Sequence, residues 1–372
     1  MSDYLDQRPP EISQYPLGPL TCDQLEQWLK EEDPSRLCLL WKAADEMRRS
    51  VVGDEVHLRG LLEISNYCMR SCHYCGLNCS NQTLLRYRMT AEEIMASARL
   101  AVLFGYGTIV MQAGEDSGIS KDWISDIIKR LKDKYELAIT LSLGERSIEE
   151  LQAWRDAGAD RYLLKFETSD RKLFQKIHPA GVSSQLSRIE LLREMKQMGY
   201  ETGSGVMVGI PGQTWRILAN DICLFRELDC DMIGCGPYIV HPQTELGREA
   251  ARPPNSEQVP YEQREEVTYK VVALSRLVCP EANIPSTTAL AITNKISGRS
   301  SGLQRGANVV MPNITPPHYR RFYEIYPDKA SNVEAVEVSH QSIKQGIELL
   351  GRTVGRGPGG RRAAASNTQT GS

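Results

Sequence analysis

Long hydrophobic runs are absent from this chain of 372 residues. No stretch approaches the ~20 apolar residues that a membrane-spanning helix needs, and the N-terminus lacks the basic start and apolar core of a secretory signal. An excess of basic charge is also absent, because the formal net charge at pH 7 is −3. The sequence therefore gives no reason to expect a membrane or a nucleic acid as a partner.

Cysteine is too sparse for a disulfide scaffold, since ten cysteines in 372 residues fall far below the density of small disulfide-stapled proteins. Unpaired thiols require reducing surroundings, so we expect a cytoplasmic protein. Six cysteines are scattered through apolar segments and are predicted to be buried small hydrophobic residues: Cys22, Cys38, Cys223, Cys230, Cys235 and Cys279.

Three further cysteines stand close together in the order Cys68, Cys72 and Cys75, with three and then two residues between them. Cysteine is the usual protein ligand of a [4Fe-4S] cluster, and three thiolates leave one of the four irons free to chelate a small molecule. Zinc is an alternative, with Cys79 or His73 as the fourth ligand, but this spacing is not typical of paired zinc knuckles.

Strand-like apolar runs alternate with amphipathic helical stretches after a helical lead at about residues 22–50. The helical stretches include 90–104, which Thr90 can cap, and the segments 123–134 and 187–198. The apolar runs lie at residues 58–65, 107–113, 136–142, 160–166, 200–209, 230–239, 283–288 and 306–311.

Eight strand-then-helix units predict an α/β protein with a parallel sheet, and eight is the number that closes a barrel. We therefore predict a complete (β/α)8 TIM-type barrel with a short helical N-terminal extension, in preference to an open doubly wound sheet. The predicted parts are the extension at 1–50, the barrel at 51–352 and a disordered tail, rich in Gly, Ala, Ser and Arg, at 353–372.

Polar or glycine-containing sequence follows each predicted strand, where barrel enzymes place their chemistry. Gly114 would let the backbone approach a ligand, and Glu115 could accept hydrogen bonds from an ammonium group. Glu167 could bind ribose hydroxyls, and Arg188 could pair with a carboxylate. Gly209 would form a turn that accommodates an adenine edge. The alternative for Glu115 is an ordinary loop carboxylate, for Arg188 a solvated helix face, and for Gly209 a purely structural turn.

The chain from about residue 55 to 351 closely resembles the HydE family, the radical S-adenosylmethionine maturases of [FeFe]-hydrogenase. The cysteine spacing, with the aromatic Tyr74 before the third cysteine, is the signature of the radical S-adenosylmethionine enzymes. The family resemblance is carried by the segments LNCSNQTLLRYRMT, TLSLGE, AGADRYLLKFET, MVGIPGQT, IPSTTA and ANVVMPNITP.

The resemblance implies that a cluster and its cosubstrate lie at one end of an internal cavity in the barrel. It assigns the cluster to Cys68, Cys72 and Cys75. The cofactor-binding residues predicted from motif and resemblance together are Tyr74, Gly114, Glu115, Ser142, Glu167, Arg188 and Gly209. The predicted substrate or anion contacts are Thr140, Lys165, Thr287, Thr288, Tyr323 and Tyr326.

The implied activity is reductive cleavage of S-adenosylmethionine to a 5′-deoxyadenosyl radical, which attacks a cysteine-bound iron–carbonyl–cyanide precursor. The cofactor is the reactive species, so no side chain is predicted to be catalytic. The implied partners are a reductant such as ferredoxin or flavodoxin and the maturases HydG and HydF. The alternatives are a methylornithine synthase, a biotin-synthase-like sulfur inserter, for whose second cluster Cys235 is a weak candidate, and an iron–sulfur carrier without enzymatic activity.

Two departures from the family pattern affect these expectations. Many members carry three more cysteines that bind an accessory cluster, and Ser331, Ser339 and Ser342 stand at the corresponding positions. Serine is a poor ligand for soft metals, so we expect no second cluster. Relatives can have Arg-His where this chain has Lys165-Phe166, and lysine keeps the charge but loses the planar fork of arginine.

Overall fold

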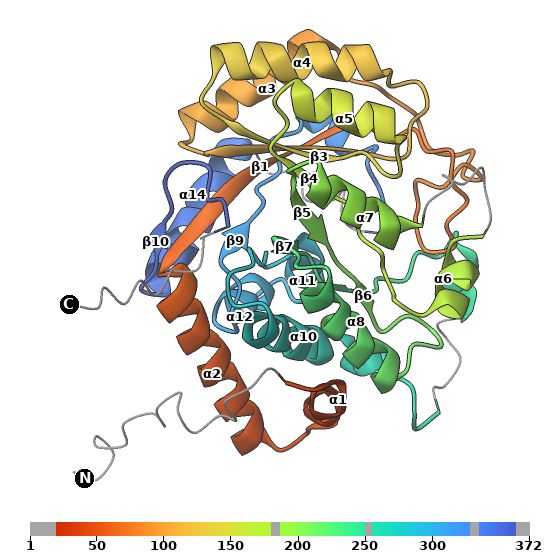
Figure 1. The fold of residues 1–372 in the computed structure, drawn as a ribbon, viewed down its shortest axis with the longest axis vertical. Helices are drawn as coiled ribbons and strands as arrows, with labels where there is room; N and C mark the ends of the chain where they lie inside the picture. The colour runs from red at the N-terminus through yellow and green to blue at the C-terminus, as the bar shows by residue number, and fades with distance from the viewer. Residues whose placement is uncertain (1–19, 180–186, 250–254, 328–334, 362–372) are drawn as a thin grey trace.

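The computed structural model describes residues 20–179, 187–249, 255–327 and 335–361. Two helices lead into the sheet (Figure 1), α1 (Cys22–Lys30) and α2 (Pro34–Val52). The predicted helical lead is interrupted because Pro34 cannot continue a preceding helix and begins a new one, capped by the side chain of Asp33. The predicted extension thus contains two helices, and its residues 1–19 lie outside the described part of the chain.

A parallel sheet curls through the centre of the molecule (Figure 1). Two short strands, β9 (Val309–Val310) and β10 (Thr353–Val354), also pair with β1 in parallel. A separate parallel pair joins β6 (Met207–Val208) to β8 (Gly236–Pro237). The main strands pair in the order β1 (Glu55–Ser65), β2 (Thr108–Ala113), β3 (Ala138–Ser142), β4 (Arg161–Leu163), β5 (Glu201–Ser204) and β7 (Met232–Ile233).

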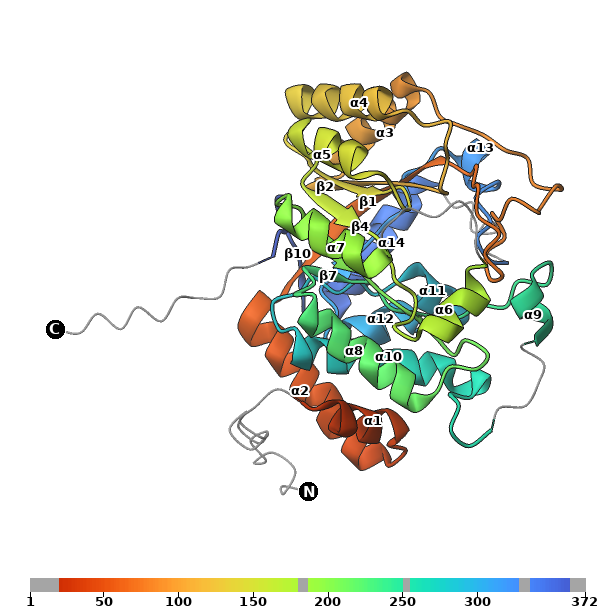
Figure 2. The ribbon, with the colours of Figure 1, turned by 45° about the vertical axis from the view of Figure 1, so that its right-hand side comes forward.

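Helices follow the strands and cover the outside of the sheet (Figures 1 and 2). The longer ones are α3 (Ala91–Leu103), α4 (Lys121–Lys134), α5 (Ile148–Asp156), α7 (Arg188–Gln197), α8 (Trp215–Glu227), α10 (Arg264–Val278) and α14 (Val336–Leu349). The shorter ones are α6 (Arg171–Ile177), α9 (Glu245–Glu249), the 3-10 turn η2 (Tyr261–Gln263), α11 (Thr288–Thr293), α12 (Gly298–Leu303) and α13 (Pro317–Arg320).

The apolar runs of the sequence become strands because a parallel sheet is covered on both faces. The last eight residues of β1 are all buried, including the charged Arg59 and Glu63. Amphipathic helices supply the outer layer. In α4, for example, the buried positions Ile124, Ile127 and Ile128 recur on one face, and Ser120 caps the first turn. The predicted α/β class with a parallel sheet is confirmed.

Pairing continues beyond the regular ladder through two isolated parallel bridges. Met232 of β7 pairs with Asn283, and Pro285 pairs with Val309 of β9. The segment 283–285 therefore lies between β7 and β9, and β9 in turn pairs with β1. The predicted strand run at 283–288 is thus represented by single bridges in place of a full ladder.

The prediction of a disordered tail at 353–372 is wrong for residues 353–361, and residues 362–372 lie outside the described part. The segment 355–361, here called the C-terminal strap, lies across the starts of the strands. The glycines permit close approach, since a Cβ on Gly107 would lie 1.7 Å from the Gly357 carbonyl oxygen. Strand side chains donate to the strap: Thr108 Oγ1 (2.9 Å) and Arg161 Nη2 (3.0 Å) to Pro358, and Arg59 Nη2 (2.9 Å) to Gly359.

The prediction of buried, unpaired cysteines is wrong at four positions. Cys22 of α1 and Cys223 of α8 form a disulfide, because α1 packs directly against α8 and brings their Cα atoms to 6.2 Å. Cys38 is exposed on α2, and Cys279 is only half-buried. Cys230 and Cys235 are buried, as expected.

Candidate active site

The loop after β1 carries the three closely spaced cysteines. Cys72 is buried, Cys68 and Cys75 are half-buried, and none of the three forms a disulfide. Burial raises the pKa of the Cys68 thiol and raises that of Cys72 further, so both favour the protonated form in the absence of a positive partner. A metal cluster supplies that positive charge and binds the thiolates.

Backbone hydrogen bonds from neighbouring loops hold the cysteine loop in place. Met69 N donates to the Glu115 carbonyl at 2.9 Å, and Gly76 N donates to the Ile325 carbonyl at 3.0 Å. Gly114 is required here, because a Cβ on it would lie 2.3 Å from the Tyr67 carbonyl oxygen. The absence of a side chain at Gly114 therefore lets the end of β2 press against the cysteine loop.

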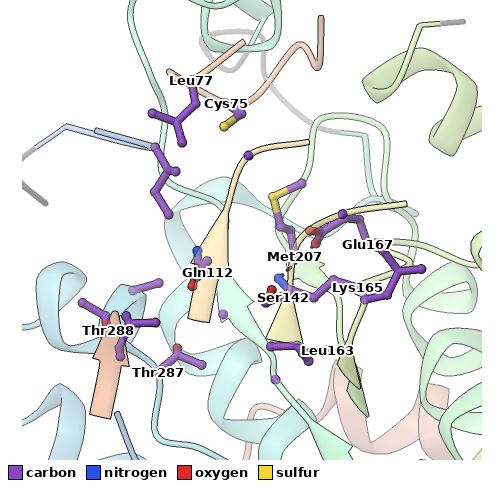
Figure 3. Close-up of a pocket in the computed structure, with 18 of the residues that line it drawn as sticks. Cys75, Leu77, Gln112, Ser142, Leu163, Lys165, Glu167, Met207, Thr287 and Thr288 are labelled. Carbon is purple, nitrogen blue, oxygen red and sulfur yellow. Dashed lines mark ion pairs between the residues drawn. The ribbon is translucent and has the colours of Figure 1, made fainter. Parts of the chain in front are cut away.

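A cavity of about 360 Å³ extends from the cysteine loop into the curled sheet (Figure 3). The structure brings together all but one of the predicted site residues on its lining: Cys68, Cys72, Cys75, Tyr74, Gly114, Glu115, Ser142, Glu167, Arg188, Thr140, Lys165, Thr287, Thr288, Tyr323 and Tyr326. The exception is Gly209, which forms a turn with φ of 85° and donates its N–H to Gln213 Oε1 at 2.8 Å.

Four charged side chains, one buried and three half-buried, meet beside the cysteine loop. Arg70 Nε bonds Glu115 Oε2, and Arg70 Nη2 bonds Glu145 Oε2 at 2.7 Å. Arg188 Nε bonds Glu145 Oε1 at 2.8 Å, and Arg188 Nη2 bonds Glu115 Oε1 at 3.4 Å. Glu115 and Arg188 could be predicted as site residues from the sequence, whereas Arg70 and Glu145 were not. The available signals were the position of Arg70 between two cysteines and the position of Glu145 just after β3.

Glu167 has an unusual backbone conformation, with φ of 63°, which non-glycine residues adopt at a cost of about 1–3 kcal/mol. Its N–H donates to the Gly205 carbonyl at 3.0 Å, and its carbonyl accepts from Met207 N at 3.3 Å. The Lys165 Nζ lies 3.0 Å from Glu167 Oε2, at ion-pair distance but without hydrogen-bond geometry. The turn aims the Glu167 carboxylate into the cavity beside Lys165 (Figure 3).

Polar atoms deeper in the cavity lack partners among the described residues. The buried hydroxyls of Thr140 and Thr287 and the Nε of Arg59 make no hydrogen bond there. Burial and the nearby Arg161 lower the pKa of Arg59 to about 9, so its guanidinium remains charged at pH 7. Buried polar atoms are normally satisfied, so these three groups indicate a polar or anionic ligand. Thr287 and Thr288 lie across the cavity from Lys165 in Figure 3.

Tyr74, between the second and third cysteines, points its hydroxyl away from solvent. The hydroxyl lies 3.0 Å from His178 Nε2, and the two rings meet edge to face. Burial lowers the pKa of His178 well below its ordinary value, so His178 is neutral at pH 7. A neutral imidazole can accept a hydrogen bond from the Tyr74 hydroxyl, which fixes the tyrosine ring beside the thiols.

These features fit a [4Fe-4S] cluster with an amino-acid cosubstrate. Three cysteine thiols lie on one loop at the mouth of a cavity, and paired carboxylates and arginines lie beside them. The family model of the radical SAM superfamily matches residues 62–222, which include the cysteine loop. The site and the comparison together define a radical S-adenosylmethionine enzyme.

The particular family follows from comparison over almost the whole chain. The [FeFe] hydrogenase maturase subunit HydE of Thermotoga maritima is 47% identical over 323 residues, covering 87% of this chain and 88% of that one. The chain belongs to the HydE family of [FeFe]-hydrogenase maturases, as its sequence motifs predicted.

More distant relatives lie in the same superfamily. The 3-methylornithine synthase of Methanosarcina acetivorans is 27% identical over 293 residues, covering 78% of this chain and 79% of that one. A solved methylornithine synthase superposes with a TM-score of 0.77 at 24% identity, covering 91% of this chain and 95% of that one. At this identity the structural likeness establishes the fold alone.

Proposed function

We propose that this maturase uses S-adenosylmethionine to attack the cysteine sulfur of a cysteine-bound iron–carbonyl–cyanide complex, which prepares iron for the hydrogenase active site. The observation that carries the proposal is the 47% identity to a HydE protein over nearly the full length. The thiol loop at the mouth of a cavity supports it.

The cysteine loop would hold the cluster through Cys68, Cys72 and Cys75. When bound, the cluster and S-adenosylmethionine supply a one-electron cleavage that yields the 5′-deoxyadenosyl radical. Glu115 and Arg188 would bind the ammonium and carboxylate groups of the cosubstrate. Tyr74, Gly114, Ser142 and Glu167 would complete its site, with Glu167 accepting from the ribose hydroxyls. Gly209 would contribute only through the turn that it forms outside the cavity lining.

The deeper part of the cavity would bind the iron complex. The unpartnered hydroxyls of Thr140 and Thr287 suit its cyanide and carboxylate groups, and Lys165 supplies a positive charge. Thr288 lies beside Thr287, and Tyr323 and Tyr326 line the wall. These side chains would orient the target sulfur and keep water out, which limits loss of the radical to other hydrogen donors.

Other features of the chain are proposed on the same basis. Parallel pairing from β1 through β7, the segment 283–285 and β9 back to β1 supports a complete (β/α)8 barrel. We propose a cytoplasmic location, a ferredoxin or flavodoxin as electron donor, and the maturases HydG and HydF as partners. In the described residues no helix is long and apolar enough to cross a membrane.

We also propose that no second cluster forms. Ser339 is half-buried and Ser342 is exposed on α14, and neither hydroxyl is a good ligand for iron. Ser331, the third position, lies outside the described residues. For the sulfur-inserting alternative, Cys235 is fully buried and is not among the cavity-lining residues, which gives that alternative no support.

The test is anaerobic reconstitution, reduction with dithionite, and addition of S-adenosylmethionine with a synthetic cysteine complex of iron, carbon monoxide and cyanide. We expect 5′-deoxyadenosine and conversion of the complex, both followed by mass spectrometry. Cys72→Ala should abolish both, because it removes a cluster ligand. Lysine in place of the iron complex should remain unchanged. Conversion of lysine to methylornithine, with the iron complex untouched, would overturn the proposal.

A further inference from the structure

We propose that Arg70 and Glu145 are positioning residues that fix Glu115 and Arg188 for the cosubstrate and link them to the cysteine loop. The inference rests on the proposed function, since that function assigns Glu115 and Arg188 to the amino-acid end of S-adenosylmethionine. Arg70 and Glu145, with Glu115 and Arg188, are called the charge ring below.

The charge ring is closed, because each carboxylate contacts both arginines. Glu115 accepts from Arg70 and Arg188 through different oxygens, and so does Glu145. The four residues come from separate parts of the fold: the cysteine loop, the ends of β2 and β3, and the first residue of α7. Opposite charges alternate around the ring, so the arrangement fixes the mutual positions of these four parts.

The low exposure of the charge ring makes its ion pairs costly to break. The four side chains are only 7–12% exposed, and two positive and two negative charges cancel. Removing one member would leave an uncompensated charge away from water, which costs far more than losing an exposed ion pair. The ring therefore has a strong tendency to remain complete.

Glu145 differs from the other three members because it does not line the cavity, whereas Arg70, Glu115 and Arg188 do. It can act on a ligand through the arginines that it holds. The preceding residue, Gly144, has φ of 79°, and a Cβ on it would lie 1.9 Å from Glu115 Cγ. The end of β3 is therefore packed against the Glu115 side chain as well as being joined to it through the arginines.

The geometry also indicates which contact a ligand would replace. Arg188 Nη2 to Glu115 Oε1 is the longest link of the ring at 3.4 Å, whereas Glu145 holds Arg188 Nε at 2.8 Å and the Lys165 carbonyl accepts from Arg188 Nη1 at 2.8 Å. Opening the long link frees one donor and one acceptor together. A ligand that carries both an ammonium and a carboxylate can pair with both groups and leaves the site neutral overall, which suits the zwitterionic end of an amino acid.

The test is Glu145→Gln in the reconstituted full-length protein. The substitution keeps the side-chain shape but removes the charge that holds both arginines. We expect the dissociation constant for S-adenosylmethionine to rise about 10- to 100-fold, as for loss of charge-assisted hydrogen bonds. Binding is measured by equilibrium dialysis and by the change in the electron paramagnetic resonance spectrum of the reduced cluster on adding S-adenosylmethionine. Iron content and the turnover number at saturating S-adenosylmethionine should stay near the wild-type values.

The matched control is Glu201→Gln. Glu201 accepts from the buried Arg161 at 2.6 Å, at the strand starts and away from the cysteine loop. It should lower thermal stability without changing affinity for S-adenosylmethionine. If Glu145→Gln does not incorporate a cluster, Arg70→Lys is measured in its place, because lysine keeps the charge but loses the fork that joins two carboxylates. We expect weaker binding.

Unchanged affinity for S-adenosylmethionine in a cluster-loaded Glu145→Gln or Arg70→Lys protein would overturn the inference. So would an equal loss of affinity in Glu201→Gln, because the effect would then follow general stability. The binding measurement uses no iron complex. A protein that binds and cleaves S-adenosylmethionine but leaves the iron complex unchanged therefore contradicts the proposed function and not the role of the charge ring.

Discussion

At the scale of single residues, Asp221 holds the segment after β4, which carries Glu167, through a hydrogen bond from outside the cavity lining. It lies on α8 and is fully buried. Its Oδ1 accepts from Ser169 N at 2.6 Å, two residues beyond Glu167, and its Oδ2 has no hydrogen-bond partner among the described residues. Loss of hydration raises the pKa of Asp221 to about 7. The carboxyl group is thus protonated in mildly acidic solution and charged in alkaline solution.

The pH dependence of stability should reflect this shift. The pKa of Asp221 is higher in the folded state, about 7, than its ordinary value of 3.8. The protonated Asp221 carboxyl therefore contributes its full stabilisation of the folded state below the unfolded-state pKa. This contribution is lost as the pH rises through the folded-state pKa. Asp221→Asn keeps the acceptor for Ser169 and cannot ionise. We expect the variant to gain about 1–3 kcal/mol relative to wild type between pH 5 and pH 8.

Urea unfolding at pH 5, 6, 7 and 8 measures the difference between the two proteins. The control is Asp126→Asn, which alters an exposed carboxylate of α4 and should leave the pH dependence of wild type intact. A constant difference between Asp221→Asn and wild type across this range would contradict the prediction.

The residues that line the cavity could be predicted from the sequence more readily than the residues that position them. Glu115 and Glu167 follow strands directly, and in a parallel sheet such residues converge at one edge. The pairing of Arg70 with Glu145 depends on how two loops and a helix meet, which no local pattern records. Gly114 was predicted to make room for a ligand, and the structure shows that it also makes room for the cysteine loop.

At the scale of elements, the apolar runs predicted β1 to β4 to within a few residues, but the run at 283–288 forms single bridges only, and composition failed for the C-terminal strap. The glycine- and arginine-rich sequence is typical of disorder. The strap is ordered by residues that lie far from it in the sequence. Arg59, Arg161 and Asn283 donate hydrogen bonds to its carbonyl groups. Such donors cannot be recognised from the strap sequence itself. Figure 2 shows the neighbouring β10 at the end of the molecule opposite α6 and α9, which flank the cysteine loop.

The C-terminal strap should close the cavity at the end where the strands start. Arg59 and Asn283 line the cavity, and both donate to the Gly359 carbonyl, at 2.9 and 3.2 Å. A chain that ends at Val354 loses this acceptor and leaves a buried guanidinium exposed to entering water. We expect 5′-deoxyadenosine to form with several-fold less conversion of the iron complex per molecule, because water and buffer reach the cavity.

The ratio of 5′-deoxyadenosine to converted complex is the quantity to measure, together with the melting temperature. A chain that ends at Arg361 is the matched control. It keeps the strap and lacks only residues beyond the described part, so its ratio should equal that of the full chain. An unchanged ratio in the chain that ends at Val354 would show that the strap does not seal the cavity.

At the scale of the whole molecule, the N-terminal helices α1 and α2 pack against α8 and α10, which are far from them in the sequence. Helix α1 lies beside α8 and α10 (Figure 1). Arg216 of α8 pairs with Asp23 and Glu26 of α1 at 2.6 Å each, and the disulfide joins Cys22 to Cys223. The sequence could not reveal this disulfide, because any two of ten cysteines could pair and only the packing of α1 on α8 selects these two.

The disulfide should stabilise the fold only in oxidising solution. It closes a loop of 201 residues, for which the chain-entropy model gives a stabilisation on the order of 5 kcal/mol, with measured values often nearer 2–4. We expect Cys223→Ser to lower the melting temperature of the oxidised protein by several degrees. With excess dithiothreitol, wild type should fall to the value of the variant, while Cys38→Ser, which removes an exposed free thiol, should match wild type in both solutions.

Because α1 and α8 contribute no residue to the cavity lining, cleavage of S-adenosylmethionine should be equal in the reduced wild type and in Cys223→Ser. A difference in melting temperature of the same size with and without dithiothreitol would assign the effect of Cys223 to packing, and the disulfide would then have no part in stability.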